Sequence, residues 1–431
     1  MDPAIITLCV LGVAAFLFIT ELIPLAVTAM AACTALGILG VLPSKAVYAG
    51  LSNSTVVLFG GMFVIGAAMF KTGLAEAIGV AVVKKAGTNE IPLMAAIMVV
   101  TIVLSAVSSN TGTVACLMPV IIGICSVAKL PASKQLMPLA IAANVGGTIT
   151  MIGTPPNVIV TGALTTAGLP TFGFFEFAWI GIPLSLVITI YTLFIGRHMI
   201  AAKSAGAMDE EAIKAAKEEA GASDDDAPKS KTKMWISGLI LIGVVLCMAL
   251  DLKTVPLHTA AVTGAILCVV TGCLKEKEAY AGIDWVTIFL FAGMLSVATA
   301  MEKTGAGKLI ADTVVSMMGT NPNPYVLTAV LFLISNVLTQ FMSNTASAAL
   351  LAPIGISIAQ SIGADPKPVL MALGIAASCA FATPMATPPN TLVLGPGGFS
   401  FNDYAKVGVP MCVISLIVCL VVIPIVWPFG M

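Results

Sequence analysis

Two short polar stretches stand in apolar surroundings, and the second repeats the first. Ser108-Ser109-Asn110-Thr111-Gly112-Thr113 lies within residues 91–128, a run of 38 residues without a charge. Ser343-Asn344-Thr345-Ala346-Ser347 follows 234 positions later, and a proline stands eight residues after the threonine in both stretches. So many small polar residues in an apolar segment are costly in a lipid environment unless they bind something.

A second pair of stretches interrupts the apolar chain with prolines. Gly153-Thr154-Pro155-Pro156-Asn157 returns 233 positions later as Ala386-Thr387-Pro388-Pro389-Asn390. A Pro-Pro pair cannot continue a helix, because it removes backbone donors and frees carbonyl groups upstream. Free carbonyls at membrane depth are tolerated only where they line a site or pack within protein. These carbonyls are therefore candidate cation ligands.

Side-chain oxygens beside the two breaks could complete a cation shell, because hard cations prefer hydroxyl, amide and carbonyl oxygens. Past each bend a new half-helix begins, and its free N–H groups and positive dipole end suit an anion. A single Ser or Thr in a membrane helix usually serves packing. Matched recurrence in two places favours binding instead. The candidate oxygens are those of Ser105, Ser109 and Asn110 in the first stretch and of Thr339, Ser343 and Asn344 in the second.

The charge of a ligand bound between these stretches is constrained by what they lack. No Lys or Arg lies within either bend or break, and Arg197 is the only arginine of the chain. Burying an unpaired dianion is prohibitive. Either the ligand is not an anion, or mobile cations enter with it. Two oxygen-rich pockets flanking one anion satisfy the second option, with Na⁺ as the co-ligand.

Composition places the chain in a membrane. Hydrophobic residues make up 58% of its 431 residues, 10% are charged, and the mean hydropathy is +1.06. Apolar runs of 17 or more residues recur throughout, which predicts an all-α polytopic membrane protein. A net charge of −1 argues against nucleic acid as a partner. The ten Cys form no CxxC motif and predict neither disulfides nor a zinc site.

The chain is one unit duplicated. Phe59-Gly60-Gly61-Met62 matches Phe291-Ala292-Gly293-Met294 at an offset of 232, in the same order as the other matches. Each copy is expected to hold spans, a short amphipathic helix, a polar stretch, a broken helix and a last span. The expected segments are 5–20, 24–42, 55–70, 74–86, 91–128, 134–165 and 177–196 in the first copy, and 234–250, 256–274, 285–301, 306–318, 325–360, 367–394 and 407–426 in the second.

The polar stretches at 91–128 and 325–360 are expected to be re-entrant hairpins, because a full crossing needs about 20 residues per arm. Two full crossings are the alternative. With hairpins, each copy has about five crossings, and the odd number gives two inverted-topology repeats. Alternating sides puts fifteen Lys and Arg on one face against five on the other. This bias places the linker 199–233 in the cytoplasm of a multi-pass inner-membrane protein.

These residues resemble the divalent anion/sodium symporter family, which comprises di- and tricarboxylate transporters and sulfate carriers. The similarity covers nearly the whole chain, and Ile19-Thr20-Glu21-Leu22-Ile23-Pro24 is similar to the family's early Thr-Glu-Ala-Ile-Pro signature. The resemblance implies one sodium site from Ser105, Ser109, Asn110 and Gly153, and a second from Thr339, Asn344 and Ala386. It implies substrate contacts from Asn110, Thr111, Ser343, Asn344, Thr345, Thr387 and Pro388.

The resemblance further implies a homodimer in which a transport domain slides like an elevator against a static scaffold. The scaffold would comprise 1–87 and 234–320, and the transport domain 88–198 and 321–431. The expected function is sodium-coupled symport of a C4-dicarboxylate such as succinate. A sodium-independent dicarboxylate exchanger is one alternative, and a sodium/proton antiporter using Glu21 is another. An enzyme is not expected, because the spans hold no carboxylate pair, Ser-His arrangement or metal cluster.

Overall fold

The structure is a computed structural model that describes residues 2–87, 89–204, 211, 230–250, 254–318 and 323–430. Within these residues the chain is helical, and the one pairing of extended backbone is an isolated bridge between Ala364 and Gly430. The first copy comprises α1 (Pro3–Thr20), α2 (Leu25–Ile38), α3 (Ser44–Val47), η1 (Ala49–Ser52), α4 (Ser54–Lys71), α5 (Leu74–Ala86), α6 (Glu90–Ser105), α7 (Asn110–Ala128), α8 (Ser133–Gly146), α9 (Pro155–Thr166), α10 (Ala178–Tyr191), η2 (Thr192–Gly196) and α11 (Arg197–Met199).

The second copy repeats this order. It comprises α13 (Lys231–Ala249), α14 (Leu257–Val270), α15 (Glu276–Ala281), α16 (Trp285–Thr304), α17 (Ala306–Met318), α18 (Pro324–Leu338), α19 (Asn344–Ser361), α20 (Pro366–Ser378), α21 (Pro388–Leu394) and α22 (Phe401–Val426). The amphipathic helices α5 and α17 have the bounds that the sequence predicted. Most of the predicted linker, at 205–210 and 212–229, lies outside the described residues.

Both predicted helix breaks are present. Residues 147–154 separate α8 from α9, and residues 379–387 separate α20 from α21. Pro155 and Pro388 are the first residues of the helices that follow, a position where the missing N–H has no helical partner to lose. Thr154 and Thr387 precede them with extended backbone, at φ −146° in both. The repeat therefore extends to the local backbone geometry.

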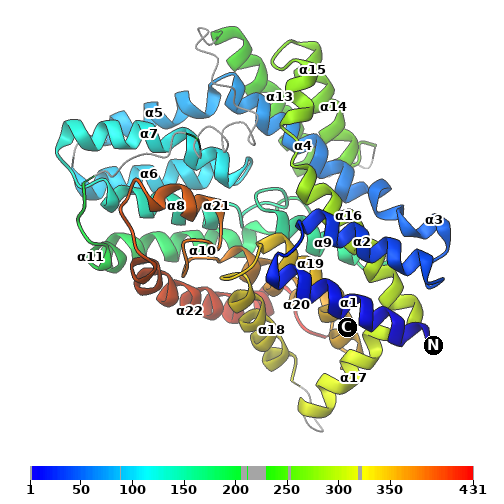
Figure 1. The fold of residues 1–431 in the computed structure, drawn as a ribbon. Coiled ribbons are helices and arrows are strands. Elements are labelled where there is room, and N and C mark those ends of the chain that lie inside the picture. The colour runs from blue at the N-terminus through cyan, green and yellow to red at the C-terminus, as the bar shows by residue number, and fades with distance from the viewer. Residues whose placement is uncertain are drawn as a thin grey trace.

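The two copies are interlocked, as Figure 1 shows for α2 beside α16 and α4 beside α14. Two equivalent glycines make this packing close. A Cβ on Gly61 would lie 2.8 Å from the Ala261 backbone, and one on Gly293 would lie 2.8 Å from the Ala29 backbone. Small residues allow helices to approach closely where lipid supplies no hydrophobic drive. This reciprocal contact is the packing that two inverted repeats produce.

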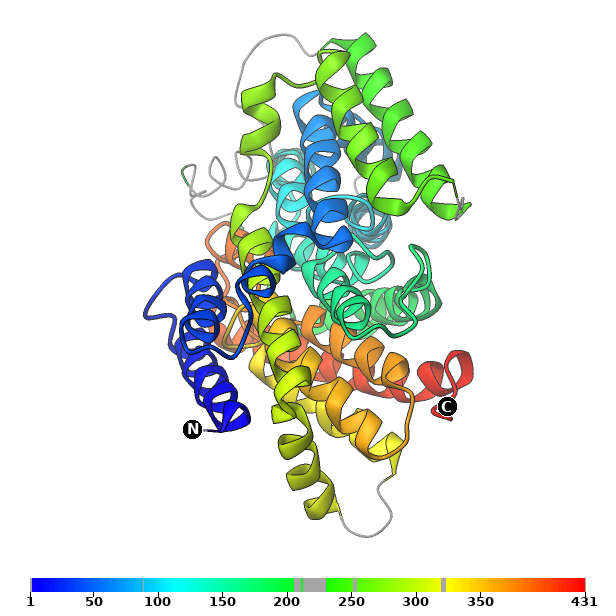
Figure 2. The same ribbon diagram turned by 90° about the vertical axis from the view of Figure 1, so that its right-hand side faces the viewer.

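Seven of the described helical segments are long and apolar enough to cross a membrane, including Pro3–Thr20, Lys231–Ala249 and Phe401–Val426. Four shorter apolar helices accompany them: Leu25–Ile38, Glu90–Ser105, Leu257–Val270 and Pro324–Leu338. The outer helices turn large apolar side chains outward, as at Phe16, Trp179 and Trp235, whereas α8 and α20 are almost wholly buried. In the second view (Figure 2), the dark blue α1 and α2 lie along one flank. The protein is an all-helical, multi-pass membrane protein.

The polar stretches lie where pairs of helices meet. Helices α6 and α7 are joined through residues 106–109, and α18 and α19 through residues 339–343. These are the bends that the sequence predicted. Their depth in the bilayer, and the division into scaffold and transport domains, stay predictions.

Candidate functional site

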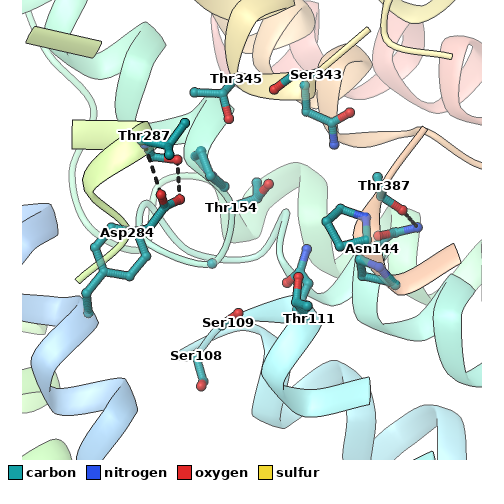
Figure 3. Close-up of a pocket in the computed structure, with 18 of the residues that line it drawn as sticks. Ser108, Ser109, Thr111, Asn144, Thr154, Asp284, Thr287, Ser343, Thr345 and Thr387 are labelled. Atoms are coloured by element: carbon teal, nitrogen blue, oxygen red, sulfur yellow. Dashed lines mark hydrogen bonds between the residues drawn. The ribbon is translucent and has the colours of Figure 1, made fainter. Parts of the chain in front are cut away.

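A cavity of about 510 Å³ lies where the two bends meet the two breaks. Figure 3 shows Ser108, Ser109, Thr111 and Thr154 of the first copy around the same space as Ser343, Thr345 and Thr387 of the second. These two groups of residues form the first tip (Ser108, Ser109, Thr111 and Thr154) and the second tip (Ser343, Thr345 and Thr387) of the cavity. The two tips are more than 200 residues apart in the sequence and face one another.

Four oxygen atoms converge behind the first tip. Ser105 Oγ donates to Ala143 O at 2.8 Å and lies 2.5 Å from Asn110 Oδ1. The same amide oxygen lies 3.1 Å from Gly153 O and 3.2 Å from Ala143 O. Oxygens this close require either a cation among them or a turned Asn110 amide, whose nitrogen would then face all three and donate its two hydrogens among them. The ligand set matches what a hard cation prefers.

The second tip repeats this arrangement. Thr339 Oγ1 donates to Ala377 O at 2.8 Å and lies 2.5 Å from Asn344 Oδ1. Both hydroxyls are fully buried, and each is held by the backbone of the helix that leads into the break. Ala386, the equivalent of Gly153, also lines the cavity.

The asparagine that ends each Thr-Pro-Pro-Asn motif stabilises the helix break of its own copy through hydrogen bonds to the backbone. Asn157 Nδ2 donates to Gly147 O at 3.2 Å and to Thr150 O at 2.8 Å. Asn390 Nδ2 donates to Ala380 O and Thr383 O, both at 2.9 Å. Backbone carbonyls of the non-helical break are thereby satisfied. The two side chains have a structural role.

Four helices of the described residues begin at the cavity wall. Asn110 is the first residue of α7, Pro155 of α9, Asn344 of α19 and Pro388 of α21, and all four residues line the cavity. The first N–H groups of a helix have no partner within it, and its N-terminus carries a partial positive charge. No Lys, Arg or His lines the cavity among the described residues. Favourable charge for an anion therefore comes from helix ends, polar donors and any bound cation.

Each predicted site residue can now be placed. Those predicted to contact substrate all line the cavity: Asn110, Thr111, Ser343, Asn344, Thr345, Thr387 and Pro388. Of those predicted to bind sodium, Ser109, Gly153 and Ala386 also line it, and Ser105 and Thr339 lie directly behind it against the two asparagines. The structure thus brings the whole set together around one space. Their binding roles stay predictions.

Asn144 was missed by the sequence reasoning. It lines the cavity from α8, is 1% exposed, and donates to Thr387 Oγ1 at 3.2 Å and Asn390 Oδ1 at 3.0 Å. A signal for it exists in the sequence, because Ile141-Ala142-Ala143-Asn144 stands against Ile375-Ala376-Ala377-Ser378 in the repeat. Because Asn144 corresponds to Ser378, the two copies differ in side chain at this position.

Two carboxylates also line the cavity. Asp284, which the sequence reasoning missed, caps α16 by accepting from Thr287 N at 3.0 Å and from the Thr287 hydroxyl. Glu21 is exposed and ends α1 with a left-handed backbone, at φ 50°. The N-cap role alone explains Asp284 in the described structure.

A cavity at the meeting point of inverted repeats, built from broken helices and lined by paired polar tips, defines the class of secondary membrane transporters. The model of the citrate transporter family matches residues 15–367 and 342–429 of this chain. The chain belongs to this citrate transporter family. It is a secondary transporter of the citrate and dicarboxylate class, not an enzyme.

Curated relatives agree with this assignment. An uncharacterized transporter of Haemophilus influenzae is 30% identical over 95% of this chain and 89% of its own length. The uncharacterized transporter YfbS of Escherichia coli is 25% identical over 98% of this chain and 99% of its own. The sodium-dependent dicarboxylate transporter SdcS of Staphylococcus saprophyticus is 26% identical over 94% and 83%.

Solved structures share the fold at low sequence identity. The YdaH transporter of Alcanivorax borkumensis covers 100% of both chains with a TM-score of 0.67 at 16% identity. MtrF of Neisseria gonorrhoeae covers 88% of this chain and 82% of its own, with a TM-score of 0.61 at 15% identity.

Proposed function

We propose that the protein is a sodium-coupled symporter that takes up C4-dicarboxylates such as succinate. The observation that carries this proposal is one cavity lined by two mirror-related groups of oxygen atoms and by no basic side chain of the described residues. A dianion in such a place needs cations beside it. The sodium-dependent dicarboxylate transporter SdcS, which is 26% identical, supports the same choice.

One sodium ion would bind among Ser105, Ser109, Asn110 and Gly153, and the other among Thr339, Asn344 and Ala386. Each ion would lie at the cavity wall, so its charge would act on an anion in the cavity. Coupling follows from electrostatics, because each ligand lowers the energy of the other in the same low-dielectric space.

The carboxylates of the substrate would be bound by Asn110, Thr111, Ser343, Asn344, Thr345 and Thr387, with Pro388 in contact. These side chains offer amide and hydroxyl donors from both copies, so one carboxylate can bind at each tip. A cavity of about 510 Å³ lies within the usual size of small-molecule sites.

The proposed movement is an elevator, with 88–198 and 321–431 sliding against a scaffold formed by 1–87 and 234–320. The proposed boundary would pass through the cavity, because Phe59 and Met62 of α4 and Thr287 of α16 line it together with residues of the two tips. Translation of the tips past α4 and α16 would expose the cavity to each side in turn. A homodimer would hold the scaffold still.

Uptake of labelled succinate into proteoliposomes tests the proposal. With an inward sodium gradient, uptake should exceed uptake in choline by about ten-fold or more. Equal uptake in both media would establish the sodium-independent exchanger instead. Accessibility of cysteines introduced in 199–233 tests the cytoplasmic, inner-membrane placement, because they should react only with reagents that enter the cell.

Proton coupling is the second candidate, favoured by the two carboxylates at the cavity. Antiport of protons would require Glu21 or Asp284 to take up and release a proton during the cycle. Glu21→Gln and Asp284→Asn should leave sodium-driven uptake largely intact if sodium alone supplies the coupling. Abolition of all transport by either change, in a folded protein, would favour the proton carrier.

A further inference from the structure

Asn144 makes a contact that the other copy does not reproduce. It lies in α8 of the first copy and reaches α21 of the second, where Figure 3 shows it joined to Thr387. Its equivalent, Ser378, donates instead to Gly374 O of its own helix at 2.9 Å. Ser105 and Thr339 donate to the carbonyls of the residues just before Asn144 and Ser378, which confirms that the two positions correspond.

The orientation of the Asn144 amide is fixed by its neighbours. Asn390 uses both hydrogens of its amide on Ala380 O and Thr383 O, so Asn390 Oδ1 can only accept. Asn144 must therefore present its nitrogen to Asn390, at 3.0 Å, and the same nitrogen donates to Thr387 Oγ1 at 3.2 Å. The direction of both hydrogen bonds follows from the backbone of the break.

An oxygen that accepts from Asn144 keeps its own hydrogen for another partner. Thr387 is 4% exposed and lines the cavity, and its hydroxyl finds no acceptor among the described residues. The Thr387 hydroxyl is therefore held as a donor toward the cavity. A hydroxyl that has lost one of its rotational choices loses less entropy when it binds an anion.

The first copy shows what happens without this amide. Asn157 Oδ1 is buried and has no hydrogen-bond partner among the described residues, and no hydrogen bond reaches the Thr154 hydroxyl in that part of the chain. Asn144 Oδ1 is likewise buried without a partner there. Among the described residues, Asn144 therefore makes its side-chain hydrogen bonds through its amide nitrogen, and its amide oxygen has no partner.

We propose that Asn144 is a positioning residue that aims the Thr387 hydroxyl at a carboxylate of the substrate, so that the second tip binds its carboxylate more tightly than the first. The proposal deepens the proposed function and rests on it. Asn144 acts through Thr387 and not through the sodium residues. Its loss should weaken the substrate and leave the sodium dependence unchanged.

A double-mutant cycle in proteoliposomes tests this inference. Labelled succinate, citrate and sulfate serve as probes, and the anion that the wild type takes up is used for KM and Vmax. Asn144→Ala and Thr387→Val should each raise KM by about ten-fold, which is the effect of losing a hydrogen bond to a charged group. The double variant should show about the same ten-fold rise, with Vmax changed by less than about two-fold.

Thr154→Val provides the matched control in the first copy. Asn144→Ala should still raise KM by about ten-fold in that background, because Thr154 receives nothing from Asn144. Should Asn144→Ala not fold, as judged by its melting temperature in detergent, Asn144→Ser takes its place in the same cycle. The sodium concentration for half-maximal uptake should match that of the wild type in every variant.

Multiplicative effects of about a hundred-fold in the double variant would overturn the inference, as would a fall in Vmax at unchanged KM. An unchanged KM in Asn144→Ala would overturn it as well. Failure of the proposed function looks different, because the wild type itself would then show no sodium-driven uptake of any of the three anions.

Discussion

The two helix breaks hold the same carbonyls in place by different means. The first is built on glycine. A Cβ on Gly153 would lie 2.4 Å from Gly147 O, and a Cβ on Gly146 would lie 2.7 Å from Ile102 Cα. The second has Ala386, Ala380 and Cys379 at the corresponding positions. Because these residues carry a Cβ, the backbone segments of the second break cannot approach each other as closely.

Side chains brace the second break instead. Gln340 accepts from Ala382 N at 2.9 Å and donates to Cys379 O at 3.4 Å, and Asn336 donates to Cys379 O at 2.9 Å. Their equivalents in the first copy are Ala106 and Ile102, which have no polar side chain. Close backbone packing and buried amides thus produce one geometry. The copies share the contacts of Ser105 with Asn110 and of Thr339 with Asn344, but not the packing behind them.

The contact between a buried hydroxyl and the asparagine of the bend is alike in both copies, so losses of similar size are expected at the two asparagines. Asn110→Ala and Asn344→Ala should each lower sodium-driven uptake by about 10- to 100-fold, because each removes an amide that lies against a buried hydroxyl and lines the cavity. Uptake of labelled succinate measures the loss, and the melting temperature in detergent controls for folding. Robust uptake by both folded variants would refute the assignment of the site.

The glycines of the first break should tolerate less than their counterparts. Gly153→Ala forces a methyl group toward Gly147 O, and overpacking of this kind costs about 1–3 kcal/mol. A lower melting temperature and weaker sodium dependence are expected. The control is Ala386→Gly in the second break, which should change sodium dependence much less. Similar effects at both positions would show that the breaks do not differ as described.

The positions of the breaks, the bends and the amphipathic helices were predictable, because prolines, charges and hydropathy act locally. The repeat predicted the arrangement of the two copies, because two matching copies with an odd number of membrane crossings each must have opposite orientations in the membrane. Asn144, Asp284 and the braces Asn336 and Gln340 were not found. Asn144 and Thr387 are separated by 243 positions, and a contact of that kind depends on how the two copies interlock. Only the mismatch of Asn144 with Ser378 hinted at it.

Removing a brace should affect the second break alone. Gln340→Ala leaves Ala382 N without its buried acceptor, and an unsatisfied buried group costs about 1–3 kcal/mol. We expect a lower melting temperature and a higher sodium requirement. Gln360→Ala, at an exposed position of α19, serves as the control and should melt like the wild type. An unchanged melting temperature in Gln340→Ala would show that the break does not depend on this amide.

The smallest expected effect lies at an ion pair between the two copies, whose repeat-related counterpart lacks the carboxylate. Lys71 Nζ lies 3.2 Å from Glu278 Oε1. In the repeat, Lys303 corresponds to Lys71, but the residue that corresponds to Glu278 is Ala46, which has no carboxylate. Burial alone would raise the pKa of Glu278, but the hydrogen bond from the Lys275 backbone and the Lys71 ammonium together hold that pKa below its usual value.

A lowered pKa in the folded protein means that the stabilisation is present above the pKa of the unfolded chain and is lost as pH falls through the folded pKa. The melting temperature of the wild type should exceed that of Glu278→Gln near pH 7 and approach it below about pH 4. The difference should correspond to about 1 kcal/mol or less, as for other partly exposed pairs. A gap that widens on acidification would contradict the pairing.

The packing of Gly61 on Ala261 and of Gly293 on Ala29 bears on how the chain is synthesised. When only the first half of the chain has been synthesised, α14 is still absent. Helix α4 then lacks the Ala261 backbone against which its Gly61 packs in the folded protein. We expect α4 to remain with the insertion machinery, or exposed in lipid, until translation reaches residue 270. Expression of residues 1–204 alone should therefore give a rapidly degraded fragment, which co-expression of the remaining chain rescues.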